Sequence, residues 1–562
     1  MAQNITLQGA SYSDVPSVVL PKTGGGTASF TDVTDTTASA NDVAAGKYFY
    51  TAAGVKTEGT STGGGGTTAG TVTQDANGYL ILDDDAPAGP TLITKSITAN
   101  GTYNASSDSA DGYSSVTVNV SGGGGGGDMS DPIRFFDYDG TLVASYSSVP
   151  ASLPSVPTHT GLTSGTWNYT LAQVQTQFNA MGTCDVGANY STVSGATEID
   201  IELQEGRLHP YLSLAVKGTV EIDWGDNFTS TSTGISLTTR KTDIHHEYAA
   251  AGSYTIKITK TSGTGYSLCC TSTYFLLNNN SGTAAANRVY ASRVKRARIG
   301  ADCTIGNYAF NYCSELESVS IPSTASLIST SIFYLCGVLK GVNIPSGNTT
   351  LGASLFNSCS SLANVSIPSS VTQISNAMFS GCYSLQNISI PSGVTSIGNN
   401  AFANCYTLQS ISIPSGVTVI YYSAFQTCSS LERIDIPSTV AEIGYGTFNG
   451  CRSLKDITLP TNLTTINKGS STSTTTGCFQ TCSSLISLTI PSGCTSFVQN
   501  EFKDCYGMTE YHFKATTPPT LANVNCFSNI QSDCIIYVPS SKLNDYKTAE
   551  NWATYADYMV GE

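Results

Sequence analysis

The segment AFANCYTLQSISIPSGVTVIYYS, residues 401–423, is one copy of the pattern that decides the fold of the C-terminal half of the chain. Its Ile-Pro pair and its Phe both recur every 23 residues. The prolines of this series are Pro322, Pro345, Pro368, Pro391, Pro414, Pro437 and Pro460. Pro491 follows after 31 residues, because that copy carries an eight-residue insertion. A constant period of this length predicts a solenoid, in which each coil buries its apolar face only against its neighbours.

Within each copy, L-x-x-I-x-I predicts one short strand whose two isoleucines point inward. The Pro that follows ends the strand, because it cannot donate a hydrogen bond to a continuing ladder. The unit AF-x-x-C-x-x-L-x-x-I-x-I-P-S-G-V-T-x-I-G resembles the BspA-type leucine-rich repeat. The resemblance implies a leucine-rich-repeat solenoid over residues 303–515, with coils stacked about 4.8 Å apart.

The cysteines follow the same period. Of 17 cysteines, most stand three residues after the Phe of a copy: Cys313, Cys336, Cys359, Cys382, Cys405, Cys428, Cys451, Cys482 and Cys505. One thiol per coil predicts a column in which cysteine serves as a small buried hydrophobe. We expect free thiols, and the absence of a C-x₂-C pair from the sequence argues against a zinc site.

Residues 516–562 predict a cover for the last coil, which a solenoid needs at its end. Phe527 to Pro539 keeps the Phe-to-Pro offset of the regular copies and indicates a degenerate coil. Residues 540–559 then predict a helix, with Ser540 or Ser541 as its N-cap. The side chains expected on one face of this helix are Leu543, Tyr546, Trp552, Tyr555 and Met559.

The region before the repeats consists of small β modules separated by glycine runs, so the predicted fold class is mainly β. The expected division is a β module at 1–62, a linker at 63–90, a small β module at 91–121, a glycine linker at 122–130, a β-rich module at 131–215, an immunoglobulin-like module at 216–280, a solenoid cap at 281–302, the solenoid at 303–515 and the degenerate repeat with its helical cap at 516–562.

The immunoglobulin-like module is identified by resemblance. The segments VEIDWGDNF and HEYAAAGSYTIKIT, which lie near residues 216–260, resemble a PKD-type β-sandwich. In that family the Asp and Gly residues of the first motif shape a turn, here Asp223 to Asp226, and the aromatic residues fill the sandwich.

Two other motifs suggest functions that their surroundings do not support. Leu20 to Gly24 reads LPKTG, the sortase recognition motif, but a sorting signal lies near the C-terminus, so we interpret it as a strand followed by a turn. Asp137 to Thr141 reads DYDGT and resembles the first motif of haloacid-dehalogenase-type phosphatases, which would use Lys217 and the acids of Asp223 to Asp226. That fold needs a helix directly after the motif, and the segment that follows is rich in Pro and Ser, so we expect no catalysis there.

The composition of the chain argues against several classes of function. Charged residues make up 12% of the chain and the formal net charge is −15, which argues against nucleic-acid binding. No run approaches the roughly 18 apolar residues of a membrane span. A glycan-cleaving enzyme needs paired carboxylates, whereas the acids of the repeats are scattered. We therefore expect no enzyme, no cofactor and no metal.

The segments ITLQGASYSDVPSVVLPKTGGG and ITANGTYNASSDSADGYSSVTVNV are similar to parts of tail-associated virion proteins of phages that infect Gram-positive gut bacteria. The resemblance implies a virion protein made in the host cytoplasm and released by lysis. Its N-terminal region would contact other virion proteins, its solenoid would bind a host-surface glycan or protein, and it is expected to be a homo-oligomer. The alternative is a bacterial leucine-rich-repeat adhesin.

The expected binding surface lies where side chains point out of the solenoid. On the strand face most outward residues are small: Asn364, Ser366, Asn387, Ser389, Ser410 and Ser412. Arg433, Asp435 and Asp456 break this pattern, and Tyr383 and Tyr406 follow the Cys column and should stack one coil apart. These five residues are the predicted binding site, because aromatic and charged groups amid a neutral field favour recognition.

Overall fold

The computed structural model describes residues 129–281, 283–468 and 476–562, and the strands within residues 1–128. The chain divides into two compact units, Met1–Asp128 and Met129–Glu562. The first unit contains β1 (Gln3–Leu7), β2 (Ala10–Lys22), β3 (Gly26–Ala28), β4 (Thr31–Asp32), β5 (Tyr48–Tyr50), β6 (Lys56–Glu58), β7 (Thr71–Gln74), β8 (Leu80–Asp83), β9 (Leu92–Ile93), β10 (Gly101–Asn104) and β11 (Ser115–Val120).

Nine of these strands form one sheet with the order β10-β11-β1-β2-β3-β9, to which β4, β7 and β8 are attached. Strand β1 pairs with β11, and β2 pairs with β8. The pairing therefore joins the segments 1–62 and 91–121, which the sequence suggests are separate modules. The first three residues of the LPKTG motif lie in β2, and Thr23 and Gly24 lie outside the described residues, as do the glycine runs at 63–66 and 122–127.

The second unit begins with a module that we call the side module, residues 129–196. It contains β12 (Ile133–Phe136), β13 (Leu142–Tyr146), β14 (Thr166–Trp167), α1 (Leu171–Met181) and β15 (Cys184–Asn189). The strands form a sheet with the order β13-β12-β15-β14. A capping box between Thr170 and Gln173 starts α1, and Gly182, at φ 71°, ends it.

The next segment connects the side module to the repeats through one continuous sheet. It contains β16 (Thr197–Leu203), β17 (Tyr211–Leu212), β18 (Leu214–Asp223), β19 (Thr229–Ile235), β20 (Gly252–Leu268), β21 (Leu277–Asn278), α2 (Ala284–Ala291), β22 (Val294–Arg298), β23 (Cys303–Ile305) and β24 (Ser318–Ser320). The sheet order is β19-β18-β20-β16-β22-β24, with β23 on β20. Because β22 pairs with both β16 and β24, this sheet crosses the boundaries expected at residues 216, 281 and 303.

The turn after β18 is held by the residues that carry the PKD resemblance. The Asp223 carboxylate accepts a hydrogen bond from the Gly225 N–H at 2.9 Å. The Tyr248 hydroxyl donates to the Trp224 carbonyl at 2.9 Å, and His246 lies 2.7 Å from the Asp226 carboxylate. These contacts fix the turn against the sheet.

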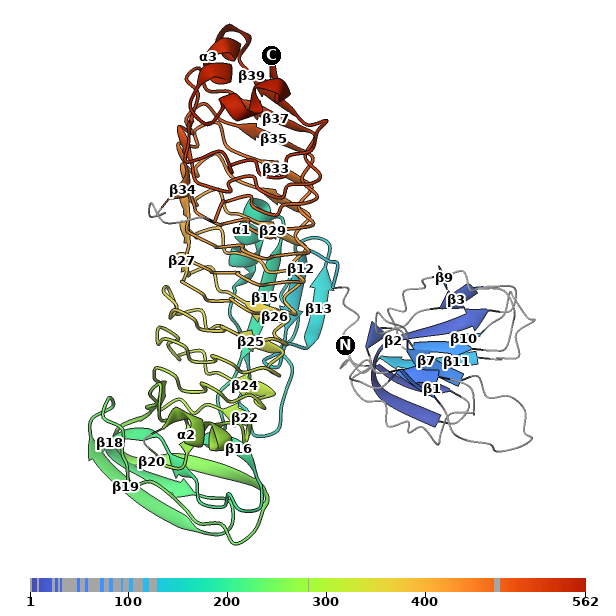
Figure 1. The fold of residues 1–562 in the computed structure, drawn as a ribbon. Coiled ribbons are helices and arrows are strands. Elements are labelled where there is room, and N and C mark those ends of the chain that lie inside the picture. The colour runs from blue at the N-terminus through green and yellow to red at the C-terminus, as the bar shows by residue number, and fades with distance from the viewer. Residues whose placement is uncertain are drawn as a thin grey trace. The chain divides into compact units, whose positions relative to one another are not determined.

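From β24 onward the chain is a solenoid, seen edge-on in Figure 1. The predicted strands form the first ladder, which has no strand in the coil that contains residues 387–389 and which β40 extends at the C-terminal end. Its strands are β25 (Gly341–Asn343), β26 (Asn364–Ser366), β29 (Ser410–Ser412), β31 (Arg433–Asp435), β33 (Asp456–Thr458), β35 (Ser487–Ile490), β37 (Glu510–Phe513), β39 (Ile535–Val538) and β40 (Met559–Gly561).

The prediction of one strand per coil is incomplete, because the T-x-I segment of the repeat forms a second parallel ladder. This ladder contains β27 (Gln373–Ile374), β28 (Ser396–Ile397), β30 (Val419–Ile420), β32 (Glu442–Gly444), β34 (Thr465–Lys468), β36 (Ser496–Phe497) and β38 (Thr520–Leu521). The residues of its Ile position are buried, so each coil contributes apolar side chains to the core from two strands.

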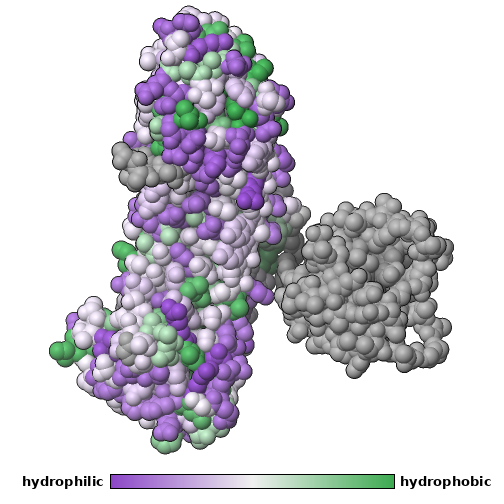
Figure 2. All heavy atoms as spheres, in the orientation of Figure 1, coloured by the Kyte–Doolittle hydropathy of each residue, from purple (hydrophilic) through white to green (hydrophobic). Residues whose placement is uncertain are grey.

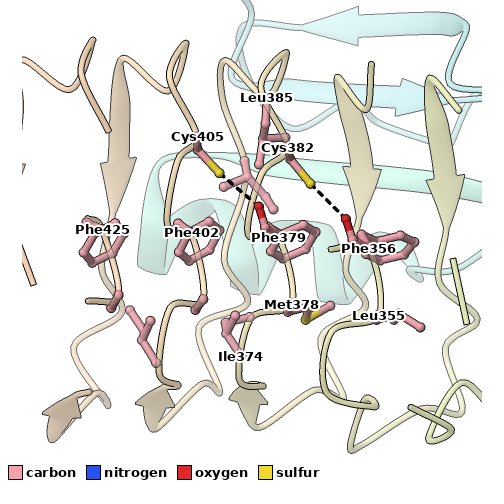
Figure 3. Close-up of a cluster of buried hydrophobic side chains, with 14 of the residues drawn as sticks. Leu355, Phe356, Ile374, Met378, Phe379, Cys382, Leu385, Phe402, Cys405 and Phe425 are labelled. Atoms are coloured by element: carbon pink, nitrogen blue, oxygen red, sulfur yellow. Dashed lines mark hydrogen bonds between the residues drawn. The ribbon is translucent and has the colours of Figure 1, made fainter. Parts of the chain in front are cut away.

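The core of the solenoid is a stack of phenylalanine rings (Figure 3). From Phe310 to Phe527, successive ring centroids lie 4.9–6.1 Å apart, with planes within 23° of parallel. The cysteine column lies beside it, and its nine thiols are buried, as predicted. Each thiol from Cys336 onward also donates to the carbonyl of the Phe one coil earlier, as Cys405 does to Phe379 at 3.2 Å. Cysteine is therefore a hydrogen-bond donor here as well as a hydrophobe.

Replacing Cys405 tests this double role. We expect Cys405→Ala to lower the free energy of unfolding by about 1–2 kcal/mol, because it removes both buried volume and the donor. Cys405→Val removes the donor without leaving a cavity, but it adds about one methyl group to a fully buried site, so we expect a loss of about 1 kcal/mol or more. Urea unfolding of the full chain measures both. Equal stability of the Val variant and the parent would show that the thiol bond contributes nothing.

The C-terminal cover differs from the single helix expected over 540–559. The structure has a 3₁₀ turn at Ser540–Lys542, α3 (Leu543–Thr548), a second 3₁₀ segment at Ala553–Tyr558, and then strand β40. Ala549 is extended, which breaks the helix, and neither proposed serine caps it. The predicted apolar residues Tyr546, Trp552, Tyr555 and Met559 are nevertheless buried, and Leu543 packs against the same core.

Candidate functional site

Three of the predicted site residues form a charged group on the first ladder. The Arg433 guanidinium lies 3.1 Å from the Asp435 carboxylate and 3.6 Å from that of Asp456, and all three side chains are exposed. The ladder places Arg433 directly opposite Asp456. Exposed ion pairs contribute little to stability, so this group is available to a ligand at small cost.

The two predicted tyrosines stack as expected. The ring centroids of Tyr383 and Tyr406 lie 4.9 Å apart at an interplanar angle of 15°, and the residues are 45% and 41% exposed. They follow Cys382 and Cys405 in the turn before the strand segment. The tyrosines and the charged group thus lie in different segments of the coil, and both groups are exposed.

The side module lies against the outward face of β25 and β26 (Figure 1), which corrects part of the predicted surface. Ser366 and Ser389, expected to face solvent, are buried under the module. The Ser366 hydroxyl donates to the Asp185 carbonyl at 2.6 Å, and the Ser389 N–H donates to the Asp185 carboxylate at 3.2 Å. That carboxylate also pairs with the buried Arg134 at 2.8 Å. On the next coil Ser410 and Ser412 remain exposed.

The residue before each repeat proline carries a backbone carbonyl that the ladder leaves without a partner. In this parallel ladder each strand residue faces a partner residue in the next coil. Its carbonyl oxygen accepts a hydrogen bond from the N–H of the residue that directly follows that partner. That position is proline in the regular coils, which has no N–H. One coil lacks this proline and shows the bond that the others lose. There Lys514 stands in place of the proline, and its N–H donates to the Ile490 carbonyl at 3.1 Å. We call this series of carbonyls the carbonyl row.

The side module supplies the missing donors on three successive coils. Asn168 Nδ2 donates to the Ile344 carbonyl at 2.9 Å, the Tyr169 hydroxyl to Ile367 at 2.7 Å, and Gln177 Nε2 to Ile390 at 2.8 Å. The row continues past the module at Ile413, Ile436 and Leu459, and these three residues are 6–8% exposed, against 0–1% under the module. Among residues 129–281, 283–468 and 476–562, no donor reaches these three carbonyls.

The DYDGT motif does not bring a phosphatase site together. Asp137 lies 2.8 Å from His159, and its backbone carbonyl accepts from Asn343 Nδ2 at 2.8 Å. Lys217 lies on β18, in a different sheet, and Asp226 pairs with His246. Within the part of the chain that the structure describes, no three side chains of His, Cys, Asp or Glu are grouped to hold a metal ion.

Most of the visible surface of the second unit is hydrophilic or neutral, and its apolar patches are small and scattered (Figure 2). The described residues include no helix with the length and apolar character needed to cross a membrane.

The repeat region matches the family model of the BspA type leucine rich repeat region in six copies, at residues 290–407, 372–476 and 418–546. No curated protein matches the chain. Similar solved structures include a leucine rich cell surface protein from Faecalibacterium prausnitzii, with 27% identity over 46% of this chain and 70% of that one, at a TM-score of 0.29. A leucine-rich repeat protein from Bacteroides ovatus has 20% identity over 54% of this chain and 88% of that one, at a TM-score of 0.29. The T. pallidum leucine rich repeat protein has 28% identity over 32% and 72%, at a TM-score of 0.25.

Proposed function

We propose that this chain, whose repeats match the BspA-type leucine-rich repeat family, is a non-enzymatic attachment protein that presents its solenoid to a receptor on a bacterial surface. The observation that carries the proposal is the uncovered part of the first ladder. There the exposed Arg433 group stands next to carbonyls without donors, while the neighbouring coils are covered by the side module. A solenoid presents such a face as a rigid extended surface, which suits recognition.

The setting we propose is a phage virion, with residues 1–128 as the anchor to other virion proteins and the assembled particle containing several copies. The support is the similarity of the N-terminal segments to tail-associated proteins. We also propose that the turn at Asp223 to Asp226 belongs to a PKD-like module, which the hydrogen bonds around Trp224 support. The buried state of most of the 17 free thiols is compatible with synthesis in a reducing cytoplasm.

The second candidate is a bacterial cell-surface adhesin, and the match to the BspA-type family favours it equally. Mass spectrometry of purified virions and of cell envelopes separates the two. Peptides of this chain in virions support the first proposal, and peptides in envelopes of uninfected cells support the second. Neither setting involves catalysis by the chain, and we expect Asp137→Asn to leave receptor binding unchanged.

The predicted site residues give a test of attachment itself. We expect the pair Tyr383→Ala and Tyr406→Ala, or the charge reversal Arg433→Glu with Asp456→Lys, to weaken cell binding about tenfold. Each change removes exposed groups without touching the core, so thermal unfolding should shift little. Binding of the labelled full chain to bacterial cells provides the measurement. Variants that bind as tightly as the parent would exclude both groups from the receptor site.

A further inference from the structure

We propose that the uncovered part of the carbonyl row, at Ile413, Ile436 and Leu459, together with the outward side chains of β29, β31 and β33, binds a neutral, hydroxyl-rich glycan chain. We call this surface the acceptor strip. The inference rests on the proposed attachment function and names the ligand chemistry of the same face.

The strip continues an interface that already exists within the chain. On the preceding coils, the row accepts hydrogen bonds from two amides and from a phenol hydroxyl, and the shortest of the three is the O–H bond from Tyr169, at 2.7 Å. The row therefore accepts one donor in each coil, about 4.8 Å apart, and at Ile367 that donor is an O–H group. At Ile413 the side module has ended, and the exposed fraction of the residue rises to 8%, against 1% at Ile390.

The side chains around the strip extend the set of polar groups. Ser410 and Ser412 on β29, Asp435 on β31 and Thr458 on β33 are exposed and supply hydroxyl and carboxylate oxygens. The Arg433 guanidinium is the only cation among the outward residues of these three strands, and it provides donors for ring or hydroxyl oxygens. A sugar chain offers both O–H donors and acceptor oxygens, so it can satisfy every group of the strip.

The composition of the strip disfavours a protein partner. Protein interfaces depend on buried aromatic or aliphatic anchors at their centre. None of the exposed large hydrophobic side chains in the described residues lies on β29, β31 or β33. A polypeptide would bury the strip without gaining an apolar core, whereas a glycan gains hydrogen bonds along its length.

Charge narrows the class of glycan. Two carboxylates and one guanidinium leave the strip with one net negative charge, and the chain as a whole carries −15. Sulfated, phosphorylated or uronic-acid polymers would be repelled. A neutral polysaccharide has no such penalty.

The experiment applies the fluorescent full chain to an array of bacterial surface glycans, neutral and anionic. Ser412→Trp should cover the strip, because Ser412 occupies the repeat position at which Ser366 and Ser389 lie under the side module. The double change Pro437→Ala and Pro460→Ala should restore the N–H groups that reach the Ile413 and Ile436 carbonyls, as Lys514 does for Ile490. Thr418→Trp, exposed beside the second ladder in the same coil, is the matched control.

We expect binding to at least one neutral glycan, a dissociation constant raised tenfold or more by Ser412→Trp and by the proline pair, and a change below twofold in the control. Binding restricted to anionic glycans, or neutral-glycan binding that Ser412→Trp leaves intact, would overturn the inference.

Periodate, which cleaves vicinal diols of sugars, should abolish binding to whole cells. If protease abolishes cell binding and periodate does not, the receptor is a protein: the glycan inference is then wrong, while the attachment function stands. A chain that binds no cells contradicts the attachment function itself.

Discussion

Phe402→Ala is expected to lower the free energy of unfolding by about 3–5 kcal/mol. The Phe402 ring is fully buried and lies 5.3 Å from Phe379 and 5.4 Å from Phe425 in the stack. Its removal leaves a cavity between two coils that the rest of the coil cannot fill, because the neighbouring rings are held by their own coils. Since a solenoid is stabilised mainly through contacts between adjacent coils, the loss weakens the interfaces of this coil with both of its neighbours.

Urea unfolding of the full chain, followed by circular dichroism, provides the measurement for Phe402→Ala. Phe228→Ala is the matched control, because Phe228 is 65% exposed and its loss should change the stability by less than about 0.5 kcal/mol. An additional unfolding step in the Phe402 variant would show that the solenoid has separated at this interface. Similar stability of the two variants would contradict the importance of the stack.

Stability should fall as the pH rises from about 5 to 8, because of Glu501. This carboxyl occupies the position before Phe502, where several other coils carry Ala, and it is fully buried. Burial raises its pKa from 4.5 to about 7, although Asn467 Nδ2 at 2.6 Å and the Cys478 N–H at 3.1 Å favour the ionised form. Between these two pKa values the folded chain holds a proton that the unfolded chain has released.

The resulting stabilisation is fully present below pH 4.5 and is lost as the pH rises through about 7. The loss is on the order of 3 kcal/mol. Glu501→Gln should remove this pH dependence and make the chain more stable than the parent at about pH 8, because the amide stays neutral. It can also donate to Asn467 Oδ1, a buried oxygen that has no partner among the residues that the structure describes.

Urea unfolding at several pH values measures the effect of Glu501, and Glu205→Gln, an exposed acid, is the control. The control should follow the parent at each pH. A parent whose stability is constant between about pH 5 and 8, or a Glu501→Gln variant with the same slope as the parent, would refute the assigned role.

The sequence predicts the solenoid in detail because the same residue pattern recurs in each coil. A 23-residue spacing fixes which residues of successive coils are neighbours, so the Phe stack, the Cys column and the Tyr383–Tyr406 pair follow directly. The second ladder is missing from the prediction because T-x-I supplies only two or three residues per coil, too few for a period-2 pattern. The helical cap is only partly predicted, since a break at Ala549 leaves no clear signal in the sequence.

Contacts between distant segments could not be predicted. Asn168 and Ser366 are hydrogen-bonded across 198 residues, and no pattern in either segment indicates the other. The side module's position on the first ladder, and hence which half of that face stays open, depends on such contacts. The carbonyl row could have been found, since every proline of the series removes one N–H from the ladder and Lys514 is the visible exception.

The longer coil that ends before Pro491 has a consequence for how such a chain can change. Phe448 and Phe479 flank the eight-residue insertion, yet their rings lie 5.6 Å apart, as in coils of standard length. The Phe core of this coil therefore packs as it does in coils that lack the eight extra residues. Natural variation, or a grafted epitope, can lengthen the chain at this position while the remaining coils keep their register.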